Sequence, residues 1–297
     1  IMTIAGLEEG VVQPESRISD PGFYYFGNRS FRDWKKDGHG AVDLHRAIVE
    51  SCDVYFYQLG PRIGIDKIAK WARAFGLGEK TGIALDDEKS GTIPDTEWKR
   101  KRFRQPWFPG ETVSVAIGQG YVTVTPLQMA NMIAAVANGG TLYRPWIVRT
   151  VESVTGAVIH QYGPEKIRSI EIKPDTLERL RNGLADVVKL PSGTGGAARS
   201  NIVAIAGKTG TAQVVEMKGG YVKSEQLAYF NRDHAWFVSY APVENPQIAV
   251  AVLVEHGGHG GSAAAPMAKK VIEKFIEQQS RPAGQRQVRA EGDSRAN

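Results

Sequence analysis

One short stretch constrains the fold of this chain more than any other, the segment Ala-Gly-Lys-Thr-Gly-Thr-Ala at residues 206–212. An apolar run rich in β-branched residues precedes it and two valines follow it, a composition typical of a β-strand. Gly207 and Gly210 interrupt this strand, and glycine is unfavourable there unless another backbone or a ligand must come close. The stretch therefore predicts a strand with something lying against it.

The polar side chains of this strand indicate what kind of ligand that is. Lys208 offers a fixed positive charge, and Thr209 and Thr211 offer hydroxyl donors beside the amide groups of the strand edge. Together they suit a peptide-like anion, such as a chain that ends in a carboxylate. A phosphate-binding loop is excluded, because that motif needs a glycine five residues before the Gly-Lys pair and this chain has Ile202 there.

Composition is that of a globular protein, with 42% hydrophobic and 23% charged residues in a chain of 297, enough for one large domain or two small ones. The net charge is +5. The chain shows no basic stripe with interleaved aromatics, so we expect no nucleic-acid partner. At the densest basic run, residues 99–104, we expect a solvated loop rather than a partner or membrane-surface contact. One cysteine, Cys52, excludes an internal disulfide, and we expect it to be a buried small residue. No apolar run reaches about 18 residues, so no membrane span is predicted.

Hydrophobic periodicity and turn residues predict the order of the elements. Helices are expected before Gly10, from Asp43, over 65–76, from Pro126 behind a capping box at 125–128, from Asp175 and from Pro266. Strands are expected in a hairpin at 23–32, at 146–148, at 157–159, around Lys208, at 235–240 and at 248–254, the last two antiparallel across a short turn. Residues 77–115 are predicted to be mostly loop, and 192–196 a mobile loop.

The first residues of the chain read as the end of a helix already under way, so we expect the chain to be the C-terminal part of something longer. We expect one domain over residues 1–279, incomplete at its start, and a polar, disordered tail over 280–297.

Two motifs, Ser51-x-Asp53 and Lys208-Thr209-Gly210, with Gly-Gln-Gly at 118–120 between them, resemble those of penicillin-recognising acyl transferases. That superfamily is marked by Ser-x-x-Lys, Ser-x-Asn and Lys-Thr/Ser-Gly. Longer segments resemble class B penicillin-binding proteins, and residues 33–40, 97–99 and 233–237 are most similar to the elongation-specific branch, penicillin-binding protein 2. The resemblance implies an α/β fold of the α+β type, related to serine β-lactamases and transpeptidases, with an antiparallel sheet flanked by helices and a mainly helical subdomain.

The chain departs from the family pattern in two ways. Asp53 stands where most relatives have asparagine, and a carboxylate can accept a hydrogen bond from an amide but cannot donate one to a carbonyl. The nucleophile motif Ser-x-x-Lys is absent, and the resemblance places it upstream of Ile1 together with the first strands of the sheet. The edge of the strand at 248–254 would then be unpaired and apolar, which predicts aggregation.

The resemblance implies a peptidoglycan D,D-transpeptidase that cross-links stem peptides through a serine acyl-enzyme, and that also binds penicillins. Ser51 would relay a proton to the leaving amine. Lys208 would maintain the electrostatic environment of the site through its positive charge and would orient Ser51. Thr209, Gly210 and Thr211 would bind the substrate, with the two hydroxyls on its terminal carboxylate and the Thr211 N–H as an oxyanion donor. No metal and no organic cofactor is expected.

Several alternatives remain open at this point. Cys52 as a thiol nucleophile and a metal site at His256 and His259 are both disfavoured, because neither has the partners that such chemistry needs. Within enzymes, a β-lactamase or a carboxypeptidase is a rival. Outside enzymes, the rival is a non-catalytic penicillin- or peptide-binding module or sensor of the same fold.

The resemblance also implies a location and partners. The domain would face the periplasm from a bacterial inner membrane, held by an anchor that these residues do not include. Its partners would be stem peptides, β-lactams, a glycan-polymerising membrane protein and the machinery of cell elongation and cell shape.

Overall fold

In a computed structural model of the chain, residues 1–215 and 226–280 are described. The predicted tail lies outside the described residues from position 281 onward. Within the described ranges, no helix is long and apolar enough to cross a membrane.

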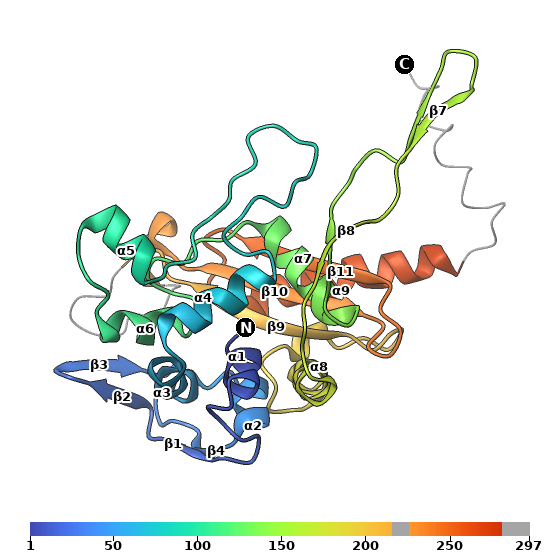
Figure 1. Cartoon of the computed structure of the whole chain (residues 1–297). Coiled ribbons are helices and arrows are strands. Elements are labelled where there is room, and N and C mark those ends of the chain that lie inside the picture. Colours follow the sequence, from blue (N-terminus) through green and yellow to red (C-terminus); the bar gives the residue numbers. More distant parts are fainter. Residues whose placement is uncertain (216–225, 281–297) are drawn as a thin grey trace.

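A three-stranded antiparallel sheet forms the centre of the molecule, made of β9 (Ala206–Ala212), β10 (His234–Ala241) and β11 (Ile248–Val254) (Figure 1). Its order is β11-β10-β9, and in the β9–β10 pair Lys208 lies opposite Val238. The three predicted strands and the antiparallel pairing of the last two are confirmed. As expected, β11 is an edge strand of the sheet in the part of the chain that the structure describes.

Alternate side chains of β10 enter two different cores, as the two-residue period of a strand requires. Ala235 and Phe237 pack against α9 (Gly260–Gln279). Val238 and Tyr240 face the larger core, which includes residues of α7 (Pro126–Ala137) and α8 (Pro174–Lys189). The sheet is therefore covered by helices on both faces, which confirms the predicted fold class.

The helix boundaries test the capping signals. The capping box at α7 is confirmed, because Thr125 Oγ1 accepts from Gln128 N while Thr125 N donates to Gln128 Oε1. The prediction that the last helix begins at Pro266 is wrong. Helix α9 begins at Gly260 and runs through Pro266, which lies beyond the first turn and therefore leaves one backbone hydrogen bond of the helix unmade.

The other α-helices of the described residues form the helical subdomain. They are α1 (Met2–Glu8), α2 (Leu44–Val49), α3 (Asp53–Ile63), α4 (Ile65–Ala74), α5 (Thr96–Phe103) and α6 (Pro109–Val115). Residues 77–115 are mostly loop, as predicted, but two helices that the prediction missed, α5 and α6, lie within them. The sequence of α5 has almost no apolar face, so periodicity does not reveal it.

The other strands of the described residues form two-stranded antiparallel sheets. They pair β1 (Ile18–Asp20) with β4 (Gly40–Val42), β2 (Phe23–Phe26) with β3 (Arg29–Arg32), β5 (Thr141–Arg144) with β8 (Glu165–Ser169) and β6 (Thr150–Glu152) with β7 (Val158–Gln161). The hairpin at 23–32 is confirmed. The strand predicted at 146–148 is wrong, since those residues connect β5 to β6 in the arm that extends from the body in Figure 1.

Candidate active site

Ser51 ends helix α2 in a conformation that serine rarely adopts. Its φ is +56°, in the left-handed region that favours glycine. Cys52 N donates to Ala47 O at 3.0 Å and Ser51 N donates to Ile48 O at 3.4 Å, which is the hydrogen-bond pattern of a Schellman helix end. Glycine is the usual residue at that position, so the serine indicates that a hydroxyl is needed there for another purpose.

The turn carries the Ser51 hydroxyl to Lys208 on β9. Lys208 Nζ donates to Ser51 Oγ at 2.7 Å and to Thr209 O at 3.2 Å. Burial lowers the pKa of Lys208 to about 8, and the charge of nearby Asp53 opposes that shift. An ammonium group with a pKa near neutrality exchanges a proton with a bound hydroxyl more readily than an ordinary lysine does.

Asp53, the first residue of α3, lies in the same turn. Burial, and then the charge of Asp33, raise the pKa of Asp53 to about 7, while Lys208 and a hydrogen bond from Trp34 N lower it. The structure therefore brings Ser51, Asp53 and Lys208 together, as the resemblance implied.

The free edge of β9 is the face that a substrate strand could join. Thr209 O accepts from Lys208, and Thr211 O accepts from Gln119 Nε2 at 2.9 Å. In an antiparallel pair, residues two apart present their N–H and C=O groups to the same side. Because both carbonyls point away from β10, the N–H of Thr211 faces the same side, away from β10.

The two glycines of β9 make room for other parts of the protein. A Cβ atom at Gly207 would lie 2.5 Å from the Phe237 ring, and one at Gly260 would lie 2.5 Å from Gly210 O. The start of α9 thus comes against the backbone of β9 at Gly210. The predicted close approach is found, and a neighbouring backbone accounts for it at Gly210.

Sequence reasoning missed Thr194. Its hydroxyl lies 2.7 Å from that of Thr209, and its N–H donates to Val49 O at 3.3 Å. The mobile loop predicted at 192–196 is instead packed, since a Cβ at Gly193 would lie 2.3 Å from Val187 O. The glycines that suggested mobility are there because the loop approaches α8 closely.

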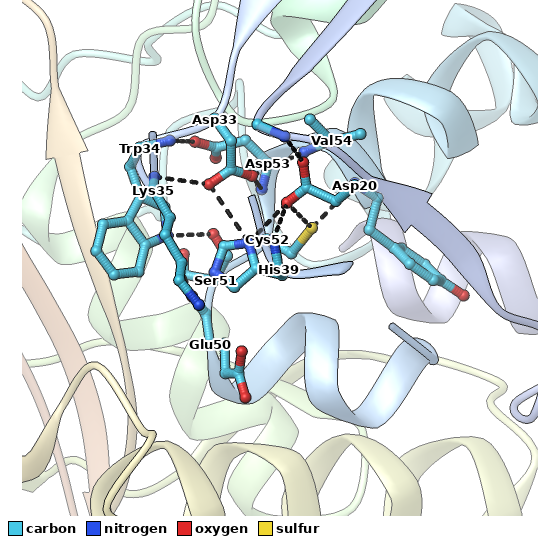
Figure 2. Close-up of polar contacts among 12 residues, drawn as sticks. Asp20, Asp33, Trp34, Lys35, His39, Glu50, Ser51, Cys52, Asp53 and Val54 are labelled. Carbon is cyan, nitrogen blue, oxygen red and sulfur yellow. Dashed lines mark hydrogen bonds and ion pairs between the residues drawn. The ribbon is translucent and has the colours of Figure 1, made fainter. Parts of the chain in front are cut away.

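Four buried side chains next to this turn form a set that suits a metal ion. They are Asp20, Asp33, His39 and Cys52, whose ligand atoms all lie within 4.8 Å of one another (Figure 2). His39 Nδ1 lies 2.7 Å from Asp20 Oδ2, and Cys52 Sγ donates to the same oxygen at 3.3 Å. Imidazole, thiolate and carboxylate donors in a group of four suit a tetrahedral Zn²⁺ site.

The buried surroundings of Cys52 raise the pKa of its thiol, mainly by desolvation, so only a cation would make the thiolate form favourable here. Cys52 is buried, as predicted, but its partners are not apolar. Sequence patterns do not reveal the set, because its members lie at four separate places: Asp20 at the end of β1, Asp33 after β3, His39 before β4 and Cys52 before α3. Within the described residues, His256 and His259 belong to no cluster of metal-binding groups.

Comparisons with known proteins agree with this geometry. The family model described as "Penicillin binding protein transpeptidase domain" matches residues 1–273. Peptidoglycan D,D-transpeptidase MrdA of Haemophilus influenzae is 41% identical over 283 residues, which cover 93% of this chain and 43% of that protein. The chain therefore spans less than half of that relative's length.

Solved structures give the same result. Penicillin-binding protein 2 of Pseudomonas aeruginosa, in complex with WCK 5153, is 40% identical with a TM-score of 0.80, covering 93% of this chain and 59% of that one. Penicillin-binding protein 2 of Helicobacter pylori, solved with MreC, is 36% identical with a TM-score of 0.79, covering 93% and 48%. With its Lys208–Ser51 pair, its strand edge and these relatives, the chain belongs to the penicillin-binding protein transpeptidase domain family and is most like its elongation-specific members.

Proposed function

We propose that these residues are part of a peptidoglycan D,D-transpeptidase that cross-links stem peptides during cell elongation. The observation that carries the proposal is the 2.7 Å hydrogen bond from Lys208 Nζ to Ser51 Oγ beside a free strand edge. Both groups belong to motifs of the family, and the strand edge suits an extended peptide.

The reaction needs a nucleophile that these 297 residues do not contain, since no Ser-x-x-Lys occurs in them. In the proposal, that serine belongs to a longer protein. It gives its proton to the lysine of the same motif and attacks the carbonyl between two D-alanines. The C–N bond breaks, and Ser51 relays the proton from that lysine to the leaving amine. The amine of a second stem peptide then attacks the ester, forms the cross-link and releases the serine.

The remaining site residues have supporting roles in this scheme. Lys208 orients Ser51 and its positive charge favours the anionic substrate, while the Thr211 N–H is one oxyanion donor. Thr209, Gly210 and Thr211 bind the substrate, with the two hydroxyls on the terminal carboxylate of the stem peptide or of a penicillin. Thr194, which fixes the hydroxyl of Thr209, belongs to the same subsite.

The proposed setting follows that of the relatives. The domain faces the periplasm of a bacterium, attached to the inner membrane by a segment outside these residues, and works with a glycan-polymerising membrane protein. The Helicobacter pylori relative was solved with MreC, which supports a place in the elongation machinery.

Covalent labelling by a fluorescent penicillin tests the proposal. The protein should include these residues together with the Ser-x-x-Lys segment. We expect labelling that survives denaturation and is abolished by Lys208→Ala. If the folded protein binds penicillin reversibly but is never labelled, the alternative holds, and the domain is a non-catalytic binding module or sensor.

A further inference from the structure

An exposed tryptophan is attached to the turn that carries Ser51. Trp34 lies in the segment after β3, and its indole Nε1 donates to Glu50 O at 3.1 Å and to Ser51 O at 3.0 Å. Figure 2 shows the ring lying alongside the Ser51 backbone. Residue 34 is 17 positions from Ser51, so tertiary structure alone makes this contact.

Both accepting carbonyls lie at the end of helix α2. The last carbonyls of a helix have no partner within it, and the Schellman turn satisfies those of Ala47 and Ile48 only. The indole therefore binds the two carbonyls that follow the turn, at Glu50 and Ser51. Without it, water would be their partner and the Ser51 peptide could rotate.

The backbone around Trp34 holds the residue that follows the turn. Trp34 N donates to Asp53 Oδ2 at 3.3 Å, and Asp33 Oδ2 accepts from Asp53 N at 2.8 Å and from Val54 N at 3.2 Å. Residues 33 and 34 therefore form hydrogen bonds with residues 50 and 51 and with residues 53 and 54, on both sides of the Ser51 turn.

Packing does not explain the tryptophan. Its side chain is 57% exposed, so most of its apolar surface gains nothing from burial. Its ring has one edge-on contact, with His39 at a centroid distance of 5.6 Å. The two hydrogen bonds are therefore the main interaction that this residue contributes.

The turn needs such support because of Ser51 itself. A non-glycine residue in the left-handed region persists only when its surroundings hold it there. The Ser51 Oγ–Lys208 Nζ distance of 2.7 Å depends on that conformation, since a change in φ or ψ at Ser51 swings the hydroxyl away from β9.

We infer that Trp34 is a positioning residue of the acyl-transfer site, which fixes the left-handed backbone of Ser51 so that its hydroxyl meets Lys208. This inference rests on the proposed function. It assigns a role to the indole N–H of Trp34. It predicts that removing this N–H lowers the rate of acylation more than it lowers the stability of the fold.

The test replaces Trp34 by phenylalanine, which keeps a ring and removes the N–H. In the protein that includes the Ser-x-x-Lys segment, we expect Trp34→Phe to acylate with fluorescent penicillin about tenfold more slowly, the effect of one ordinary hydrogen bond. The matched control is Trp146→Phe, an exposed tryptophan in the arm between β5 and β6, which should acylate at the wild-type rate.

A second comparison separates positioning from general destabilisation. In a Ser51→Ala background, where the hydroxyl is already gone, Trp34→Phe should slow acylation no further. An equal fold-reduction in both backgrounds, or a wild-type rate for Trp34→Phe, overturns the inference. If the wild-type protein is not labelled at all, it is the proposed function that fails. Thermal unfolding of each variant shows whether it is folded.

Discussion

Ser51 Oγ and Lys208 Nζ lie 2.7 Å apart although 157 positions of sequence separate them. One comes from a helix end and the other from the middle of an edge strand. The helix end holds serine in a glycine conformation, and the strand holds lysine in a site that lowers its pKa. The fold therefore holds Ser51 in a strained backbone conformation and Lys208 with a lowered pKa, and neither isolated segment would favour these states.

The first prediction concerns the backbone of Ser51. Ser51→Gly and Ser51→Ala both lose the hydroxyl and its hydrogen bond, but only glycine adopts a φ of +56° without strain. We expect the glycine variant to have the larger free energy of unfolding, by about 1 kcal/mol, and both variants to acylate much more slowly than the wild type, at a residual rate that can still be measured. Chemical denaturation measures the difference, and equal stabilities would show that the turn is not strained.

The second prediction concerns pH. The pKa of Lys208 falls from 10.5 in the unfolded chain to about 8 in the folded one, so the unfolded state binds more protons between those two values. The free energy of unfolding must therefore rise with pH across this window, by up to about 3 kcal/mol from this group. Stability curves of the wild type and Lys208→Met, measured from pH 7 to 10.5, should converge as pH rises. Parallel curves would contradict the lowered pKa.

The third prediction concerns metal content. If Asp20, Asp33, His39 and Cys52 hold Zn²⁺, purified protein should contain one zinc per chain by elemental analysis, and Cys52→Ser or Asp33→Asn should lose it. Removal by a chelator should lower the melting temperature. His259→Ala is the control and should keep the metal. A wild-type protein that takes up no zinc from zinc-containing medium would rule the site out.

The fourth prediction concerns Lys99, whose side chain is only 3% exposed. Its Nζ binds Glu111 and donates to Tyr121 OH at 2.9 Å, with the rings of Phe103 and Phe108 nearby. This corrects the expectation of a solvated basic loop at 99–104. Lys99→Met leaves the Glu111 carboxylate without its cationic partner, although Tyr121 OH and Phe108 N still donate to it, and we expect a loss of about 3 kcal/mol in unfolding free energy.

The neighbouring Lys101, on the same helix, provides the control for Lys99. Its side chain is 71% exposed and pairs with Glu97 across one helical turn, so Lys101→Met should change stability by no more than about 0.5 kcal/mol. Adding Glu111→Gln to Lys99→Met should restore part of the loss. Equal effects at the two lysines would mean that the buried ion pair contributes nothing.

Local signals were sufficient where a few adjacent residues decide the structure. The strands β10 and β11, the capping box of α7 and the helix that begins at Asp43 all follow from hydrophobic pattern and capping chemistry within a few residues. Those signals failed at α5, because its charged sequence lacks an apolar stripe and the helix is stabilised by its N-cap Asp95 and by the burial of Lys99. They also misplaced the start of α9, because proline usually marks the beginning of a helix and Pro266 lies inside this one.

By itself, the sequence determined the strand at Lys208, the fold class and the motifs that carry the family resemblance, because each of these is written in short runs of residues. Only the tertiary structure decided which groups contact one another. It brings Ser51 to Lys208, Thr194 to Thr209 and Trp34 to the Ser51 turn, and it gathers the four metal-binding groups that include Cys52. The physical reason is that local conformation depends on neighbours along the chain. These contacts instead join groups that only the packing of the sheet, helices and hairpins brings within hydrogen-bonding distance.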